Sequence, residues 1–385
     1  MDELRVLSED EDWDFLILFL PLGWRGKAKE LGALRRCRKF ADAESLLRTL
    51  LIHLSDGCSL RETAVRARYG NIASISDVAL LKRLKSSGEW LRWMASQLMR
   101  DWIERQPPAI FGRELHIRII DGSTVQEPGS TGSSWRIHYS ISLPSLQCDE
   151  VHVTSPKVGE SFKRFTVHPL DLFVGDRGFA HPSGINHVVE GEGEVLVRIN
   201  LTNVPLVESD GAAFHLLSRL RTLRGTKLGD WDVCMPCEGA LTPGRICAIR
   251  KSKQAAERAA RKALQENGCK GAVKPQTIEA AAYTFVFTTL DRRFTPAMVL
   301  EMYRGRWQIE LVFKRLKSIM GLGHLKKTDL EAAKAWIHGK LLAAFLMEAL
   351  ITAGEKFFPW GYPICENIQK VSIPLERNLI DASPA

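Results

Sequence analysis

Leu170-Asp-Leu-Phe-Val-Gly-Asp176 is apolar enough to form a buried central strand of a sheet, and it ends on an acid. Upstream, Leu115-His-Ile-Arg-Ile-Ile-Asp121 alternates apolar and polar residues as a strand does, and it also ends on an acid. Residues 135–143 and 151–154 continue the strand pattern between these two segments. Because carboxylates at strand ends emerge together at the edge of a sheet, we expect the two acids to lie close together.

A third acid lies on the helix predicted for residues 297–319. The polar residues Tyr303, Arg306, Glu310 and Lys317 are spaced so that, at about 100° per residue, they project within an arc of roughly 60°. The apolar residues of this helix fall on a neighbouring arc that can pack on the sheet, so the polar stripe should border the sheet edge. The alternative is a solvated charged face on which basic residues one turn away balance Glu310.

Three carboxylates at one sheet edge can hold hard divalent cations such as Mg²⁺, whose preferred ligands are oxygen atoms. Two such ions about 4 Å apart can activate a water on one side of a phosphodiester and stabilise the leaving oxygen on the other. Asp121, Asp176 and Glu310 are therefore the candidate ligands. The alternative for an acid at a strand end is a role in a turn or a helix cap.

The overall composition is that of a globular protein with a basic balance. The chain has 53 Lys and Arg against 45 Asp and Glu, a net charge of +8, which points toward a polyanionic partner. Its hydrophobic and charged fractions exclude disordered, collagen-like and coiled-coil chains. The apolar runs are too short to cross a bilayer and the first residues are acidic, so we expect a cytosolic protein without a membrane segment. Cys234 and Cys237 form a C-x-x-C that we interpret as reduced thiols rather than a zinc site.

The N-terminal residues have helical periodicity and a basic surface. Ser59-Leu-Arg-Glu62 is typical of a capping box that opens a helix through Arg68, and Ser76-Asp77 opens the next helix after a break at Gly70-Asn71. This layout resembles a helix-turn-helix whose second helix exposes basic residues to DNA. The alternative is a plain helical bundle with solvated basic faces. The candidate DNA contacts are Lys82, Arg83 and Lys85.

Residues 201–282 contain short strand-like pieces punctuated by Gly and Pro, as in an inserted subdomain. Within them, residues 250–274 carry eight basic residues against two acids. We interpret this segment as an extension of the insertion that faces DNA, with Arg258, Arg261 and Lys262 as candidate contacts. The alternative is a solvated helix.

Three motifs together resemble the insertion-sequence-4 family of DDE transposases. Tyr303-x2-Arg306-x3-Glu310-x6-Lys317 is similar to the Tyr-Arg-Glu-Lys signature of that family. Asp121-Gly-Ser-Thr-Val resembles its first-aspartate motif, and Gly175-Asp-Arg-Gly-Phe179 its second. With Ser76-Asp-Val-Ala-Leu-Leu-Lys-Arg-Leu84 in the helical region, the likeness covers most of residues 40–345.

The resemblance implies an α/β fold in which a mostly β insertion interrupts an RNase H-like catalytic core. A helical DNA-binding region would precede this core. The implied divisions are a helical region at 1–110, a first core part at 111–200, the insertion at 201–282 and a second core part at 283–345. The C-terminal region at 346–385 matches no part of the family, and helical dimerisation is one role open to it.

The resemblance also implies a reaction and its partners. Asp121, Asp176 and Glu310 would bind two Mg²⁺, or Mn²⁺, and Tyr303, Arg306 and Lys317 would contact the transposon end. The implied reaction is hydrolysis at the 3′ end of an insertion sequence, followed by attack of that 3′-OH on the opposite strand to give a hairpin, and then on target DNA. The implied partners are the terminal inverted repeats, target DNA and a second copy of the chain on paired ends, in a bacterial cytoplasm near the nucleoid. Two alternatives are a catalytically silent DNA-binding relic or repressor of the same fold, and a general nuclease.

Overall fold

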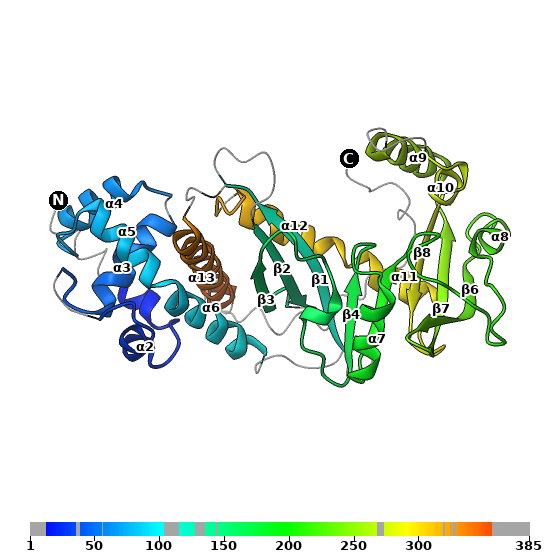
Figure 1. Cartoon of the computed structure of the whole chain (residues 1–385), viewed down its shortest axis with the longest axis horizontal. Helices are drawn as coiled ribbons and strands as arrows, with labels where there is room; N and C mark the ends of the chain where they lie inside the picture. The colour runs from blue at the N-terminus through cyan, green and yellow to red at the C-terminus, as the bar shows by residue number, and fades with distance from the viewer. Residues whose placement is uncertain are drawn as a thin grey trace.

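The computed structural model describes residues 13–35, 39–55, 57–103, 115–127, 135–143, 145–267, 273–318, 320–323, 325 and 329–355. The molecule is elongated, with N-terminal helices at one end, a sheet through the middle, and the strands of residues 229–250 at the other end (Figure 1). Of the predicted C-terminal region 346–385, residues 356–385 lie outside the described residues.

One mixed sheet of eight strands organises the described part of the chain. Its strand order is β3-β2-β1-β4-β5-β8-β7-β6. β4 and β5 run parallel to β1, and the other neighbouring pairs are antiparallel. The strands are β1 (His116–Val125), β2 (Trp135–Ser142), β3 (Cys148–Thr154), β4 (Asp171–Gly175), β5 (Glu194–Arg198), β6 (Gly229–Cys237), β7 (Ala240–Arg250) and β8 (Tyr283–Thr288).

β1 is longer than the sequence predicted. We expected it to end at Asp121, but the ladder with β2 continues to the pair Val125–Trp135. On its other side β1 pairs with β4 only as far as Ile119–Val174. Asp121 therefore lies inside β1 but beyond the end of its parallel pairing, where the sheet opens between β1 and β4.

Helices cover both faces of the sheet and form two cores. Ile119 belongs to a core with α11 (Pro296–Arg304), α12 (Trp307–Ser318) and the N-terminal helices. Its neighbour Ile120 points to the opposite core, which contains residues of α7 (Pro182–Glu190). Successive side chains of a strand point to opposite faces, so β1 is buried on both sides, as a central strand should be.

The predicted helix 297–319 is in fact two helices. α11 ends at Arg304 and α12 begins at Trp307, with Gly305 as the C-cap of the first. The Gly305 N–H bonds the Met302 carbonyl at 3.1 Å and the Arg306 N–H bonds that of Tyr303 at 3.1 Å, which is a tight 3₁₀-type turn. The prediction that Tyr303 shares one continuous helical face with Glu310 is therefore wrong.

The N-terminal region is helical, as predicted. Its helices are α2 (Trp24–Glu30), α3 (Ala43–Leu54), α4 (Leu60–Tyr69), α5 (Asp77–Ser86) and α6 (Gly88–Ile103). Ser59 and Ser76 cap α4 and α5 as expected, each accepting a backbone N–H three residues ahead. Glu62 pairs with Arg66 at 2.9 Å.

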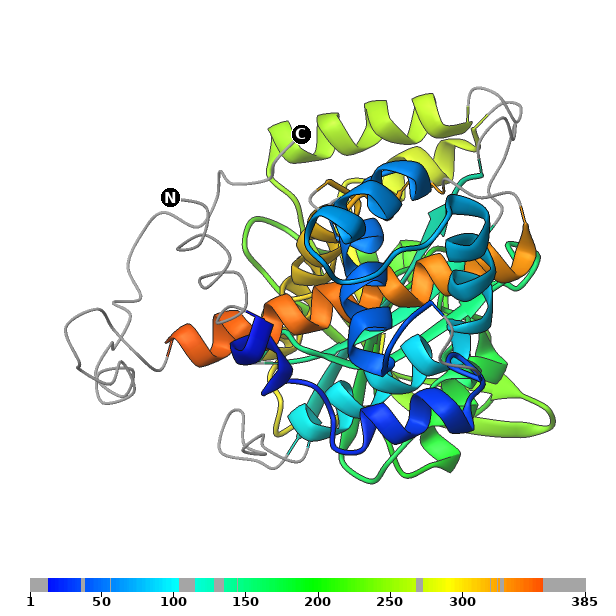
Figure 2. The same ribbon diagram turned by 90° about the vertical axis from the view of Figure 1, so that its left-hand side faces the viewer.

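α13 (Leu330–Glu355) returns the chain to the N-terminal helices. It packs against α6, α5 and α3, and Figure 2 shows it crossing between these helices. Its segment Leu330–Ala353 is long and apolar enough to cross a membrane by length and composition alone, which the shorter apolar runs of the sequence did not predict. In this structure 61% of the tested apolar stretch of this segment is buried inside the protein, as in a core helix.

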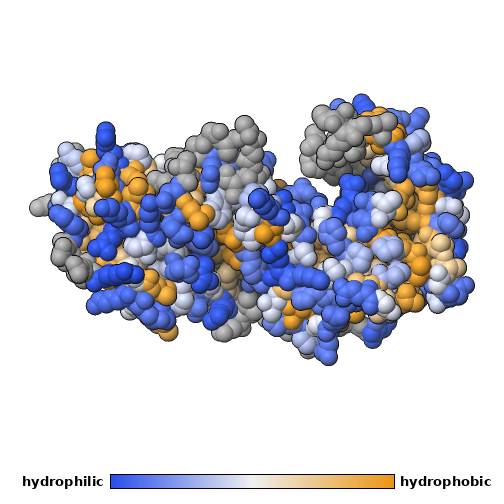
Figure 3. Space-filling model, viewed as in Figure 1, coloured by the Kyte–Doolittle hydropathy of each residue, from blue (hydrophilic) through white to orange (hydrophobic). Residues whose placement is uncertain are grey.

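The molecular surface is mostly polar on the face shown in Figure 3, where hydrophilic residues are interspersed with smaller hydrophobic groups.

The predicted insertion continues the same sheet. β6 and β7 form a hairpin, and β7 pairs with β8, so these strands extend the sheet beyond β5. The basic segment forms α9 (Lys253–Asn267), which packs on α10 (Pro275–Ala280) at the end of the molecule opposite the N-terminal helices (Figure 1). Cys234 and Cys237 both lie on β6, where their odd spacing directs them to opposite faces.

Candidate active site

Asp121, on β1, and Asp176, which directly follows β4, occupy equivalent positions relative to these neighbouring parallel strands. Ile119 pairs with Val174, and each aspartate follows its strand residue by two positions. Asp121 Oδ1 accepts the N–H of Gly122 at 2.7 Å, and Asp176 Oδ1 accepts the N–H of Gly178 at 2.7 Å. The structure thus brings the two predicted acids to the opening between β1 and β4.

Arg306 links the third acid to this opening. Its guanidinium forms an ion pair with Glu310, one turn further along α12, and lies 3.7 Å from Asp121 Oδ2. Glu310 is 59% exposed, whereas Arg306 is only 19% exposed. A single guanidinium therefore contacts two of the three predicted carboxylates, which come from elements almost 200 residues apart.

The electrostatics at Asp121 favour a cation. Burial raises the pKa of the Asp121 carboxyl to about 7, against the opposing effect of the Gly122 N–H. The negative charges of Asp176 and Glu160 raise this pKa further, and Arg306 lowers it. Because like charges disfavour ionisation of neighbouring carboxylates, a positive ion would stabilise all of them together.

The donor set fits a hard divalent cation. Asp121, Asp176 and Glu310 offer carboxylate oxygens, which are the ligand atoms that such an ion prefers. In the described ranges no group of three His, Cys, Asp or Glu residues is already arranged to hold a metal ion. The positive charge between Asp121 and Glu310 is supplied by Arg306.

Tyr303 and Arg198 adjoin Arg306 on the basic side of the site. Burial raises the pKa of the Tyr303 phenol, an effect that the charges of Arg306 and Arg198 partly offset. Lys317 lies two turns beyond Glu310 on α12 and is exposed. The structure thus places Tyr303, on α11, and Arg306, in the turn between the two helices, at the acids, and Lys317 further along on α12.

Three further cations lie beside the acids. Burial lowers the pKa of Arg198, at the end of β5, and the nearby charge of Arg177 lowers it further. Burial and the charges of Arg198 and Arg177 also lower the pKa of Lys251, to about 8. We call Arg177, Arg198 and Lys251 the cationic cluster. The position of Arg198 at a strand end, like those of the acids, is the signal by which it can be found.

The predicted DNA contacts of the N-terminal helices differ in exposure. Lys82 is exposed on α5, as predicted. Arg83 instead donates to the Ala33 carbonyl at 3.4 Å, and Lys85 pairs with Asp329 at 2.9 Å, so both lie half-buried against the protein. The prediction of three exposed cations is wrong for these two residues because α5 packs against the loop that contains Ala33 and against the start of α13.

α9 presents its predicted basic residues to solvent. Arg258, Arg261 and Lys262 are exposed, and the alanines of the helix are half-buried. If this face binds the DNA backbone, replacing Lys253, Arg258, Arg261 and Lys262 with Gln should flatten the salt dependence of DNA affinity by about 0.9 in slope per lost phosphate contact. Affinities measured across a salt series test this. Glu257→Gln on the same helix is the control and should not flatten the salt dependence. An unchanged salt dependence in the variant with all four substitutions would indicate a solvated face.

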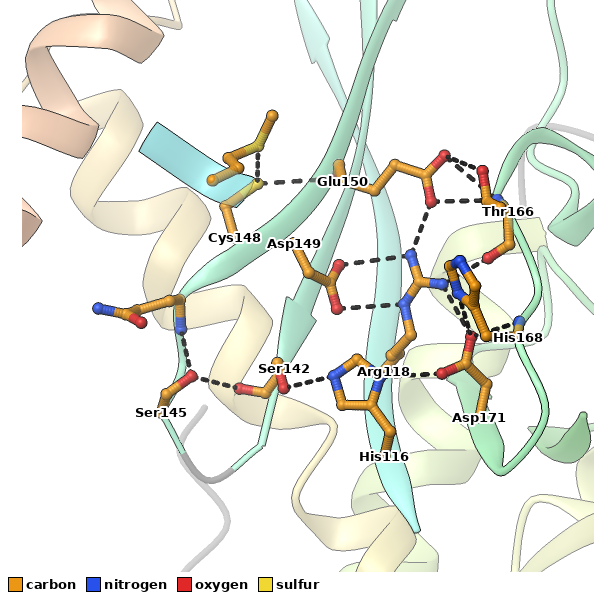
Figure 4. A network of polar contacts seen from close by, with 12 residues as sticks. His116, Arg118, Ser142, Ser145, Cys148, Asp149, Glu150, Thr166, His168 and Asp171 are labelled. Carbon is orange, nitrogen blue, oxygen red and sulfur yellow. Dashed lines mark hydrogen bonds and ion pairs between the residues drawn. The ribbon is translucent and has the colours of Figure 1, made fainter. Parts of the chain in front are cut away.

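A buried ion network links β1 to its neighbour β4 and, across β2, to β3 (Figure 4). The Arg118 guanidinium, 3% exposed, pairs with Asp149 at 3.1 Å, Glu150 at 2.7 Å and Asp171 at 3.1 Å. His116 contacts Asp171 at 2.8 Å. Arg118 precedes Asp121 by three residues, so this network fixes the strands that carry Asp121 and Asp176.

Comparisons with known proteins agree with these observations. A family model described as "Transposase DDE domain" matches residues 150–346. The transposase for insertion sequence element IS421 of Escherichia coli is 33% identical over 343 residues, covering 86% of this chain and 91% of that protein. The transposase for IS231B of Bacillus thuringiensis subsp. berliner is 23% identical over 390 residues, covering 90% and 79%. This chain belongs to the transposase DDE-domain family.

Proposed function

We propose that this protein is a Mg²⁺-dependent DNA transposase of the insertion-sequence-4 type, with an RNase H-like core. It would cleave the ends of an insertion sequence and join them to target DNA by a cut-and-paste route, with hairpin ends as an intermediate. The observation that carries the proposal is the equivalent position of Asp121 and Asp176, each two residues after the last pair of β1 with β4, with Glu310 linked to Asp121 through Arg306.

In this proposal each part of the site has a separate task. Asp121, Asp176 and Glu310 would hold two Mg²⁺, or Mn²⁺, and the bound ions supply the Lewis acidity for hydrolysis and strand transfer. Arg306 contacts both Asp121 and Glu310, so it is placed to bind a phosphate next to the reacting bond. Tyr303 and Lys317 would hold the same DNA end.

DNA would extend from this site over basic surfaces at both ends of the molecule. α5, which carries Lys82, and α9, which carries the exposed cations, lie toward opposite ends of the molecule (Figure 1). Contacts of this kind with the phosphate backbone position a duplex without reading its sequence. We propose a homodimer on paired ends, acting at the nucleoid in a bacterial cytoplasm.

The experiment is a cleavage assay on the ends of the element that encodes the protein. With Mg²⁺ we expect nicking at the 3′ ends, then hairpins or released ends, and EDTA should stop the reaction. An unrelated duplex of the same length is the control. Binding without cleavage in any divalent metal would identify a DNA-binding relic. Equal cleavage of both duplexes would identify a general nuclease.

Lys251 should make DNA affinity sensitive to mildly basic pH. Its pKa is lowered to about 8, so it is charged below that pH and loses its charge as the pH rises through 8. If the cationic cluster binds a DNA phosphate, the affinity should fall between pH 7 and 9, by up to about tenfold if one contact is lost. Lys251→Met should remove this part of the pH dependence, whereas Lys163→Met, at an exposed position on η1 (Phe162–Arg164), should retain it. Parallel pH profiles for Lys251→Met and the wild type would contradict the assignment.

A further inference from the structure

Glu160 is a fourth acid at the opening between β1 and β4. It lies on the segment between β3 and η1, close enough for its charge to act on Asp121 and for that of Asp176 to act on it. A Cβ atom built on Gly122 would lie 2.7 Å from Glu160 Oε1. A Cβ on Gly178 would overlap Glu160 Oε2 and lie 3.0 Å from Asp176 Oδ1, so both carboxylates reach within 3.0 Å of one point. The two glycines thus leave the space that the Glu160 carboxylate fills.

Phe162 fixes this position of Glu160. Its ring is fully buried, stacks on Phe179 at 5.2 Å and meets the edge of Phe173 at 5.6 Å. A Cβ on Gly175 would lie 2.7 Å from this ring, so the phenyl group packs directly on the end of β4. Because the anchored ring is only two residues from Glu160, it holds the backbone that carries this carboxylate beside the end of β4.

Glu160 has no close positive partner in the part of the chain that the structure describes. Its carboxylate makes no hydrogen bond and no ion pair with a described residue, and the charges of Arg136 and His181 act on it only at longer range. It is half-buried beside Asp176 and Asp121, whose negative charges oppose its own. A carboxylate held in this way costs free energy unless a cation joins it.

We propose that Glu160 contributes an oxygen ligand to the divalent cation held by Asp121 and Asp176, as a fourth carboxylate of the site. This inference rests on the proposed function, because it assigns a further ligand to the same site. Glu310 is exposed and reaches Asp121 only through Arg306, whereas the Glu160 carboxylate lies directly against Gly122 and Gly178. The site would therefore retain three carboxylates for one cation even while Arg306 holds Glu310.

Direct titration of the full-length protein with Mn²⁺ tests this inference without relying on activity. Glu160→Gln keeps the size of the side chain and should weaken Mn²⁺ binding by about 10- to 100-fold. Gly159→Ala is the matched control, because a Cβ on Gly159 meets nothing within 4 Å, and it should bind like the wild type. Asp121→Asn should also bind weakly. Wild-type affinity in Glu160→Gln together with weak binding in Asp121→Asn would overturn the role of Glu160 alone, whereas wild-type affinity in both would overturn the proposed function as well.

Thermal unfolding separates a metal ligand from a purely structural residue. In EDTA, Glu160→Gln should unfold at the wild-type temperature or above it, because the substitution removes a repulsive charge. On addition of Mn²⁺ its unfolding temperature should rise less than that of the wild type. A lower unfolding temperature in EDTA would instead indicate that Glu160 serves only the fold.

Gly122 provides a second test of the same contact. Gly122→Ala should push the Glu160 carboxylate away and weaken Mn²⁺ binding. In a Glu160→Ala background the added methyl group meets no carboxylate, so Gly122→Ala should cause little further loss. Equal losses in both backgrounds would contradict the proposed arrangement.

Discussion

Glu310→Gln is expected to lower the rate of DNA cleavage by on the order of 10³ or more while leaving DNA affinity nearly unchanged. Glutamine keeps the size of the side chain and an oxygen that can accept a hydrogen bond from Arg306. It removes the charge needed to hold a divalent cation, which supplies several kcal/mol of transition-state stabilisation. Binding should persist because the proposed DNA contacts are other residues: Tyr303, Arg306 and Lys317 near the acids, and the cations of α5 and α9.

Single-turnover cleavage and gel-shift titration on the same end DNA measure the two effects. Glu301→Gln is the matched control, because Glu301 is exposed on α11 and pairs with Arg304 at 3.0 Å, away from the acids. This control should cut at nearly the wild-type rate. If Glu310→Gln also cut at that rate, Glu310 would not be a ligand of the catalytic metal.

Arg118→Met is expected to lower the free energy of unfolding by about 3 to 5 kcal/mol. The substitution removes the one guanidinium that pairs with Asp149, Glu150 and Asp171, and it leaves their charges in a buried region. Chemical denaturation at neutral pH measures the loss. Arg221→Met is the control, since its solvent-exposed pair with Glu279 should contribute little to the free energy of unfolding. Equal losses in the two variants would show that the network does not stabilise the strands.

The same network predicts a pH dependence. Although burial raises the pKa values of Glu150 and Asp171, hydrogen bonds from histidine and the charge of Arg118 lower both values below their ordinary range. A lowered folded-state pKa adds stability above the unfolded value, about 4, and that stability is lost as the pH falls through the folded value. The difference between Arg118→Met and the wild type should therefore narrow below about pH 4. Unfolding curves at pH 7 and at pH 3 to 4 test this, and a constant difference would contradict it.

The sequence predicted the acids because their signals are local. The apolar run before Asp176 predicts a buried strand, and β4 confirms it. Ser59 and Ser76 predicted the starts of α4 and α5 because a cap depends on residues only three positions apart. The equivalent register of Asp121 and Asp176 follows from the pairing of β1 with β4, which no local pattern specifies.

Other features depend on contacts between distant segments. Arg118 alternates with apolar residues like an outward-facing polar residue, yet it is buried because β1 is covered on both faces and three acids from β3 and β4 surround it. The break at Gly305 interrupts a pattern that is helical on both sides. Glu160 lies outside every strand and helix, so only the fold shows that it reaches the two aspartates.

The most direct test of the acidic site is to locate bound metal. We expect crystals of the protein with its end DNA and Mn²⁺ to give anomalous scattering peaks within about 2.3 Å of carboxylate oxygens of Asp121 and Asp176, with Glu310 released from Arg306 to complete the site. Mn²⁺ bound elsewhere in a complex that still cleaves its DNA would contradict the assignment of these acids to the catalytic site.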